Sequence, residues 1–524
     1  METKLTVPIS ARDLEGAREQ ARAATAAGAE MLELRADYLE NLSGLLVRKV
    51  IEEIRGGTAG APPIIVTCRD KTEGGVIDYK MELRLEVLGS ALAAGADFVD
   101  FEYRNFLVPD SQEKMLLALS RNPKARLILS AHSFDGRFAN IGKLYRDIAA
   151  VYPATIPKLV YKADHINDCF EAFDLLHQTS GERIVFCMGQ AGSISRMMAK
   201  KLESFVTFAS VDSKSATAAG QLTVEEFKKL YRYDSIDGDT ELYGVIGWPV
   251  AHSLSPVIHN ACFARARVNK VYLPLGVEGG YAEFATFMQN MLHRKWLGLR
   301  GVSVTIPHKE NALDYVRRSR GIVEGLAQRI GAVNTVLIQP DGRMSGYNTD
   351  YAGALNAITS ALGISRAALR DMPVAVIGAG GVARAVVAGL SDVGAAIRIY
   401  NRTAERGERL AEEFGCAFSP LADLANIEAK LVINCTSIGM HPNVDATPVA
   451  RECIREDMAV FDTVYNPGET LLLRQAKEAG AKTIDGLSMF INQACAQFEL
   501  FTGESADREL MRQTVCGVDF AGNG

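Results

Sequence analysis

Short apolar runs rich in Val, Ile and Leu recur about every thirty residues through the first half of the chain, and stretches with helical periodicity separate them. Two of these stretches, 13–27 and 79–94, end close to Gly28 and Gly95, and a glycine there is a common helix stop. The alternation predicts strands at residues 4–9, 30–37, 63–69, 97–103, 125–133, 156–163, 183–189 and 205–210.

Strand and helix alternating eight times over about 230 residues favours an α/β fold of the closed (β/α)₈ TIM-barrel type, whose typical size is about 250 residues. An open doubly wound sheet is the alternative, and it usually has fewer strands. In a barrel the active site lies at the carboxyl ends of the strands, so polar residues at those ends are the first candidates for function.

Candidate charges follow the predicted strands of the barrel. Taken singly, each has a structural interpretation, such as an ion pair or a hydrogen-bonded core histidine. Taken together, they indicate a site for a small anionic substrate. Burial favours the neutral, nucleophilic form of an amine, so a strand lysine is a candidate for imine formation. The residues are Glu33, Arg35, Arg69, Glu73, His132, Lys158, Lys162 and Arg196.

The polar, turn-rich segment 234–239 marks a domain junction. It divides the chain into a predicted barrel at 1–235 and a second half that begins near 240. Within that half we expect a substrate-binding α/β domain at 240–350 and a Rossmann dinucleotide-binding domain at 351–524. We expect the last helices of the chain to return to the substrate-binding domain.

A glycine-rich turn between a strand and a helix predicts the dinucleotide site. Gly378, Ala379, Gly380 and Gly381 follow the apolar strand at 373–377. Such glycines let the backbone approach a pyrophosphate at the positive end of the following helix. The spacing departs from GxGxxG, because Ala383 occupies the place of the third glycine.

The second strand of this domain predicts the cofactor. It ends in Asn401, Arg402 and Thr403, where an NAD enzyme usually carries a carboxylate for the ribose. An arginine there suits a 2′-phosphate, so the sequence favours NADP (NADPH) as the cofactor. The alternative is that Arg402 is a solvated surface charge.

Composition narrows the classes of partner. The 57 basic and 63 acidic residues give a net charge of −6, which offers no basic footprint for nucleic acid. No apolar run approaches the ~18 residues of a membrane span, and the N-terminal residues lack a signal or transit pattern, so we expect a cytoplasmic protein. The nine cysteines form no CxxC pair, so neither a metal site nor a disulfide framework is expected.

The first half carries the motifs Glu33-Leu34-Arg35-Ala36-Asp37, Thr67-Cys68-Arg69 with Glu73, Ser130-Ala131-His132, Pro157-Lys158-Leu159-Val160, Ser195-Arg196 and Gly220-Gln221. Through these motifs it resembles type I 3-dehydroquinate dehydratase over about residues 4–230.

This resemblance implies that Lys158 forms a Schiff base with 3-dehydroquinate and that His132 is the general acid/base, with Glu73 orienting it. Lys162 shares the strand parity of Lys158, and only the Pro-Lys context and the spacing from His132 favour Lys158. Arg196 is expected to bind the substrate carboxylate bidentately. The remaining polar lining is expected from Glu33, Arg35, Arg69, Gln221 and Thr217, with Ser215 as the alternative to Thr217.

The second half carries the motifs GWPVAHSLSP at 247–256, VSVTIPHK at 302–309, GAVNT at 331–335, YNTD at 347–350, NCTSIGM at 434–440, DTVYNP at 462–467 and DGL at 485–487. Through these motifs it resembles shikimate dehydrogenase over about residues 241–505. The resemblance implies that Lys309 and Asp350 handle the proton during reduction of the 3-keto group, and that Gly486 lies near the nicotinamide. The residues expected to hold the substrate are Ser253, Ser255, Thr305, Asn334, Tyr465 and Gln493.

The two resemblances imply consecutive reactions, from 3-dehydroquinate through 3-dehydroshikimate to shikimate. A fusion acting on quinate is one alternative, because both substrates fit the same motifs. A metabolite-sensing protein that has lost catalysis is another, but Lys158, His132, Lys309 and Asp350 are all present. The oligomeric state is left open.

Overall fold

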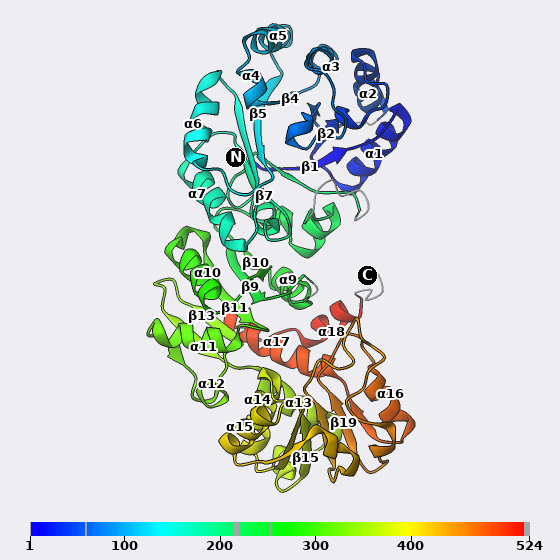
Figure 1. Cartoon of the computed structure of the whole chain (residues 1–524), viewed down its shortest axis with the longest axis vertical. Coiled ribbons are helices and arrows are strands. Elements are labelled where there is room, and N and C mark those ends of the chain that lie inside the picture. The colour runs from blue at the N-terminus through cyan, green and yellow to red at the C-terminus, as the bar shows by residue number, and fades with distance from the viewer. Residues whose placement is uncertain (1, 58–59, 213–219, 252, 518–524) are drawn as a thin grey trace. The chain divides into compact units, whose positions relative to one another are not determined.

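The computed structural model describes residues 2–57, 60–212, 220–251 and 253–517, and the chain forms two compact units. The first unit comprises Met1–Thr240 with Asn269–Leu273, and the second comprises Glu241–Val268 with Pro274–Gly524. Figure 1 labels the elements of both units along the chain.

The first unit is a barrel of eight parallel strands, as its alternating pattern predicts. Neighbouring strands pair in the order β7-β6-β5-β4-β3-β2-β1-β8, and the backbone N–H of Phe205 donates to the carbonyl of Arg183 at 2.8 Å beside the two terminal strands. The barrel is therefore nearly closed. Its strands are β1 (Lys4–Ile9), β2 (Met31–Arg35), β3 (Ile64–Thr67), β4 (Phe98–Glu102), β5 (Arg126–Ser133), β6 (Ile156–Lys162), β7 (Ile184–Met188) and β8 (Val206–Phe208).

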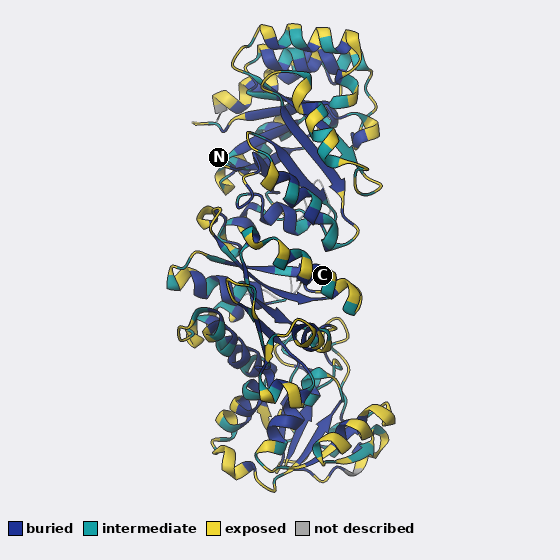
Figure 2. Ribbon diagram, turned by 90° about the vertical axis from the view of Figure 1, so that its left-hand side faces the viewer, coloured by how far each residue is buried: buried dark blue, intermediate teal, exposed yellow. Residues whose placement is uncertain are grey.

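Helices cover the outside of this barrel, and Figure 2 shows buried strands beneath helices whose outer faces are exposed. The glycine after the first helix, Gly28, has φ +98°. This left-handed backbone conformation ends the helix, and glycine adopts it without a steric penalty. The helices are α1 (Leu14–Ala27), α2 (Gly44–Gly57), α3 (Met81–Ala93), α4 (Tyr103–Phe106), α5 (Pro109–Ser120), α6 (Ile141–Val151), α7 (Phe170–Gln178) and α8 (Ser193–Met197).

The second unit begins with a mixed sheet in the order β10-β9-β11-β13-β14-β12, in which β13 runs antiparallel to β11 and β14. The strands are β9 (Glu241–Gly247), β10 (Lys270–Gly276), β11 (Leu299–Val304), β12 (Ile322–Val323), β13 (Thr335–Ile338) and β14 (Met344–Tyr347). The helices are α9 (Ser255–Ala266), α10 (Tyr281–His293), α11 (Lys309–Arg318) and α12 (Gly325–Ile330).

After α13 (Asp350–Leu362) comes a parallel sheet in the order β17-β16-β15-β18-β19-β20. In chain order this is 3-2-1-4-5-6, the doubly wound Rossmann topology, which binds ligands beyond the carboxyl ends of its strands. Its strands are β15 (Pro373–Ile377), β16 (Ala396–Asn401), β17 (Ala417–Pro420), β18 (Leu431–Asn434), β19 (Ala459–Asp462) and β20 (Lys482–Ile484).

Helices α14 (Gly381–Asp392), α15 (Ala404–Phe414) and α16 (Leu471–Glu478) belong to the Rossmann sheet. The chain ends in α17 (Gly486–Thr502) and α18 (Arg508–Cys516). Helix α17 packs against α13 and also contacts β11 and β13, so the chain returns to the first sheet of this unit. Among the described residues no helix combines the length and apolarity that crossing a membrane requires, and no cluster of candidate metal ligands occurs.

Candidate active sites

Lys158 lies on β6 inside the barrel, with a side chain only 5% exposed. Its Nζ donates to Oδ2 of Asp100 at 2.7 Å and lies 3.7 Å from Oε1 of Glu33. The ring of Phe208 lies 4.9 Å from the same nitrogen. The amine is therefore held between two carboxylates and an aromatic face.

Lys162, the alternative on the same strand, is in different surroundings. Its side chain is 50% exposed and pairs with Asp164 at 2.7 Å at the end of β6. The strand that was predicted to orient both lysines alike buries one and exposes the other, because β6 ends at residue 162. Geometry thus favours Lys158 as the amine of the barrel site.

His132 on β5 is held by Glu73, which follows β3 in a short 3₁₀ turn. One carboxylate oxygen of Glu73 accepts from the backbone N–H of His132 at 3.1 Å and lies 3.0 Å from its Nδ1. Burial, together with the nearby cations Arg69 and Lys158, holds the pKa of His132 well below its usual value. Burial raises the pKa of Glu73 to about 7. The imidazole is therefore neutral at physiological pH, with Nε2 left as the nitrogen for substrate.

Two arginines of the barrel site differ in their partners. Arg35 forms a two-point ion pair with Asp37, at 2.9 and 2.8 Å. Arg196 on α8 is buried, lies 4.5 Å over the ring of Phe186, and its Nε has no hydrogen-bond partner among the described residues. Burial lowers the pKa of Arg196 to about 10. A buried guanidinium that forms no ion pair with the described residues can receive a carboxylate.

The segment after β8 carries the remaining predicted barrel residues. Thr217 and its alternative Ser215 lie outside the described residues. Gly220 has φ +74°, and a Cβ there would lie 2.7 Å from the carbonyl oxygen of Gly189, just beyond β7. Gln221 therefore follows a close backbone contact at the carboxyl end of the barrel.

Sequence reasoning missed Asp100, the strongest partner of the lysine. It lies on β4, is 1% exposed, and also pairs with Arg69 at 2.8 Å and accepts from Ser130 at 2.7 Å. The cations Arg69 and Lys158 hold the pKa of this carboxyl far below its usual range, against the opposing effect of burial. The available signal was an acidic residue in the middle of a buried strand, two positions before Glu102.

In the second unit, Lys309 at the start of α11 lies 2.5 Å from Oδ2 of Asp350 at the start of α13. Asn334 donates from Nδ2 to the other oxygen of Asp350 at 2.8 Å and to the hydroxyl of Thr349 at 3.0 Å. The carboxylate is thus fixed from both sides, and both its partners were predicted from sequence. Thr349 was not, although it also reaches Oε1 of Gln493 at 3.4 Å.

The other predicted substrate-binding residues have local partners of their own. The hydroxyl of Ser253 accepts from the backbone N–H of Ser255, which begins α9, so this hydroxyl has a local structural role. Thr305 lies just past β11, and its carbonyl oxygen accepts from the backbone N–H of His308 at 2.9 Å. Tyr465, beyond β19, stacks on Phe490 of α17 with ring centroids 4.7 Å apart.

The glycine-rich turn fits a dinucleotide phosphate. Gly378 has φ +111°, and a Cβ at that position would lie 3.1 Å from the side chain of Thr436. No atom lies within 4 Å of a Cβ built on Gly380, which caps α14, so the helix N-terminus opens onto space that a phosphate can enter. A Cβ on Gly381 would lie 3.5 Å from Cδ of Lys309, so the turn and Lys309 lie close together. Ala379 completes the turn and is half-buried.

The remaining cofactor candidates lie at two other strand ends. Asn401 donates from its side chain to the carbonyl of Thr403 at 2.8 Å, which shapes the turn after β16, and Arg402 and Thr403 are exposed there. Gly486 starts α17 so close to β19 that a Cβ would lie 2.5 Å from the carbonyl oxygen of Val464. Packing therefore requires a glycine at this position.

These features define a two-part α/β enzyme, with a lysine-containing barrel site and a Rossmann-type dehydrogenase site. Residues 5–237 match the family of type I 3-dehydroquinase, and 245–336 match the shikimate dehydrogenase substrate binding domain. Residues 361–464 match shikimate / quinate 5-dehydrogenase, and 486–516 match the shikimate 5'-dehydrogenase C-terminal domain.

Relatives cover both halves. A chloroplastic bifunctional 3-dehydroquinate dehydratase/shikimate dehydrogenase from Arabidopsis thaliana is 34% identical over 98% of this chain and 84% of its own length. A shikimate dehydrogenase (NADP(+)) from Methanosarcina acetivorans is 41% identical over 52% of this chain and 97% of its own. A solved shikimate dehydrogenase from Thermus thermophilus, in complex with NADP(H) and shikimate, is 36% identical over 53% of this chain and 98% of its own, with a TM-score of 0.47. The chain belongs to the family of bifunctional 3-dehydroquinate dehydratase/shikimate dehydrogenases.

The comparison corrects one expectation. The first residues of the sequence show neither a signal nor a transit pattern, which predicts a cytoplasmic protein. The Arabidopsis relative that spans almost the whole chain is chloroplastic, so that expectation is wrong. The N-terminal pattern of a chain is a weak indicator of location, since it concerns only the few residues examined.

Proposed function

We propose that this chain dehydrates 3-dehydroquinate to 3-dehydroshikimate in its barrel and reduces 3-dehydroshikimate to shikimate in its second unit. These are successive steps of the shikimate pathway. The observation that carries the proposal is the pair of lysine sites: Lys158 against Asp100 in the barrel, and Lys309 against Asp350 beside the glycine-rich turn.

In the barrel, the amine of Lys158 adds to the substrate ketone, and loss of water leaves an iminium. The iminium withdraws electrons from the adjacent carbon, and neutral His132 removes a proton from it. The same imidazole then protonates the departing hydroxyl, and hydrolysis of the imine releases the product. Glu73 orients the ring through Nδ1, and Arg196 receives the substrate carboxylate. Glu33, Arg35, Arg69 and Gln221 complete the polar lining.

In the second unit, Lys309 and Asp350 move the proton at the 3-oxygen of the substrate, while Asn334 keeps the carboxylate in place. The ring hydroxyls and carboxylate are held by Ser253, Ser255, Thr305, Tyr465 and Gln493. Bound NADPH supplies the hydride, which is the part of the chemistry that no protein side chain can provide.

The cofactor is NADP, and the residues that hold it divide into two groups. The turn of Gly378, Ala379, Gly380 and Gly381 would hold the pyrophosphate at the N-terminus of α14, and Gly486 would contact the nicotinamide. The turn after β16 reads the adenosine ribose through Asn401, Arg402 and Thr403, because an exposed arginine with no neighbouring carboxylate in the turn favours a 2′-phosphate.

A coupled assay tests the whole proposal. The full chain with 3-dehydroquinate and NADPH should oxidise the cofactor, whereas 3-dehydroquinate alone should yield 3-dehydroshikimate and stop there. If NADPH is oxidised with 3-dehydroshikimate but not with 3-dehydroquinate, the barrel has no dehydratase activity. If neither substrate is turned over, the alternative of a metabolite-sensing protein is favoured. Faster turnover on quinate than on shikimate would favour the quinate alternative. That alternative is consistent with the shikimate / quinate family match at 361–464.

A further inference from the structure

A row of buried charges of alternating sign connects α3, outside the barrel, with Lys158 inside it. Arg84 on α3 pairs with Oε2 of Glu102, and Oε1 of the same carboxylate lies 3.0 Å from Arg69. Arg69 in turn lies 2.8 Å from Asp100, whose Oδ2 accepts from Lys158 at 2.7 Å. The order is cation, anion, cation, anion, cation.

Every member of this row is almost fully buried: the exposed fractions are 1% for Arg84, 0% for Glu102, 4% for Arg69, 1% for Asp100 and 4% for Lys158. Water therefore screens none of these pairs effectively, and each charge depends on its neighbours for compensation. Removing one partner of such a pair leaves an uncompensated charge whose effect extends along the row.

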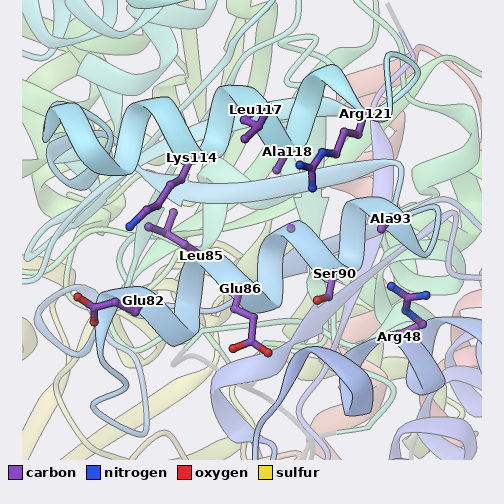
Figure 3. A pocket seen from close by; sticks show the side chains of 11 residues that line it. Arg48, Glu82, Leu85, Glu86, Ser90, Ala93, Lys114, Leu117, Ala118 and Arg121 are labelled. Carbon is purple, nitrogen blue, oxygen red and sulfur yellow. The ribbon is translucent and has the colours of Figure 1, made fainter.

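Arg84 is fixed independently of the substrate site. Its Nε donates to the carbonyl of Cys68 at 2.9 Å, and its NH1 lies 3.0 Å from Asp70. The guanidinium lies between α3 and the ends of β3 and β4, while its helix neighbours Glu82 and Glu86 line an open groove on the outside of the barrel (Figure 3). Arg84 thus reaches Lys158 through Glu102 and Arg69, and a separate route through Asp70 and Arg104 leads to Glu73 beside His132.

We propose that Arg84 is a positioning residue for imine formation, because it balances Glu102 and so leaves Arg69 to neutralise Asp100 beside Lys158. Without Arg84, Glu102 competes with Asp100 for Arg69, and Asp100 then stabilises the ammonium form of Lys158, which cannot attack a ketone. This inference rests on the proposed dehydratase activity.

The charged groups around Lys158 come from four neighbouring strands or their ends. Each of them contributes to the electrostatic balance at its amine. They are Glu33 from β2, Arg69 from just beyond β3, Asp100 from β4 and His132 from β5. Only the Arg69–Asp100 part of this set is linked to Arg84 through Glu102.

The experiment measures, in the full chain, the rate at which borohydride traps the imine of 3-dehydroquinate as a function of pH. Trapping needs the neutral amine but not the later proton transfer by His132. Arg84→Met should move the acidic limb of this profile up by about one pH unit, the size expected for one uncompensated buried charge. Glu102→Gln should move it the opposite way.

Charge-conserving changes give the sharpest check. Arg84→Lys and the double variant Arg84→Met/Glu102→Gln should both return the limb close to its wild-type position, although the second lacks the arginine altogether. Arg121→Met, which removes an exposed arginine from the same outer groove, is the matched control and should leave the profile unchanged.

Two results would overturn the inference: an unmoved limb in folded Arg84→Met, or equal shifts in Arg84→Met and the double variant. If Arg84→Met fails to fold, Glu102→Gln alone tests the inference. An acidic limb that does not move to lower pH in Glu102→Gln would then overturn it. Failure of the proposed function is distinct, since wild-type protein would then give no adduct on Lys158 at any pH.

Discussion

The two active sites differ in how their lysines are held. Lys158 belongs to a row of buried ionic groups, with Asp100 and Glu33 within 3.7 Å and further charges behind them. Among the described residues Lys309 has one ionic partner, Asp350, whose second oxygen accepts from an amide rather than from another charge. The barrel site is a network of ion pairs, and the other is a single ion pair supported by a neutral hydrogen bond.

The chemistry assigned to each site explains this difference. A lysine that becomes a covalent nucleophile must exchange its proton readily, so its ionisation has to be set by surrounding charges. A lysine that only positions and passes a proton beside a cofactor needs a fixed partner, because the cofactor supplies the reducing electrons. The site whose amine must change its protonation state thus has more buried charges around it.

The largest effect is expected from a substitution that inactivates only the barrel site. Lys158→Ala should lower dehydratase turnover by about 10⁴-fold or more, because the covalent route is lost, while shikimate oxidation is retained in the separate unit. Activity assays of both reactions check this, with Lys162→Ala as the control. A borohydride adduct mapped by mass spectrometry to Lys162 would contradict the assignment.

The corresponding change in the second unit should be smaller. Lys309→Ala or Asp350→Asn is expected to lower dehydrogenase turnover by about 10²–10³-fold, the range of a positioned proton-transfer group, since NADPH still supplies the hydride. Steady-state kinetics and NADPH titration measure the two effects separately. Normal turnover with weaker cofactor binding would show that the pair acts on the cofactor instead.

Cofactor choice provides a third test within the same unit. Arg402→Ala should raise the KM for NADP by roughly tenfold and scarcely change that for NAD, because a charge-assisted hydrogen bond to the 2′-phosphate contributes about 1.5–3 kcal/mol. Both KM values are compared in wild type and variant. Equal losses for the two cofactors would mean that Arg402 supports the turn rather than reading the phosphate.

The smallest expected effect concerns pH. Burial raises the pKa of Glu73 to about 7, and the ionised form is the better acceptor for both hydrogen bonds from His132. Dehydratase turnover should therefore rise as pH increases through about 7, by about three- to tenfold, the worth of one hydrogen bond. In Glu73→Gln this step should vanish, and its persistence would assign it to another group.

Sequence periodicity predicted the barrel strands because each is short, apolar and bounded by helical segments, and β1 agrees at both ends. The site was predictable where a charged residue stands at a strand end, as with His132. The site was not predictable where the partners come from strands far apart in the sequence. No residue near Lys158 in the chain indicates Asp100, which lies 58 positions away. Likewise, strand parity treats Lys158 and Lys162 alike, whereas only the end of β6 makes one of them exposed.

The buried guanidinium of Arg196 has a consequence for heat resistance. Arg196 forms no ion pair with the described residues and its Nε lacks a hydrogen-bond partner among them, which raises the free energy of the folded barrel. A small anion that binds there recovers part of that cost. By mass action, an anion present at about 100 times its dissociation constant adds about 2.7 kcal/mol to the free energy of unfolding. Sulfate or a simple carboxylate should therefore raise the melting temperature of the barrel in proportion to the logarithm of its concentration, and Arg196→Met should abolish that dependence.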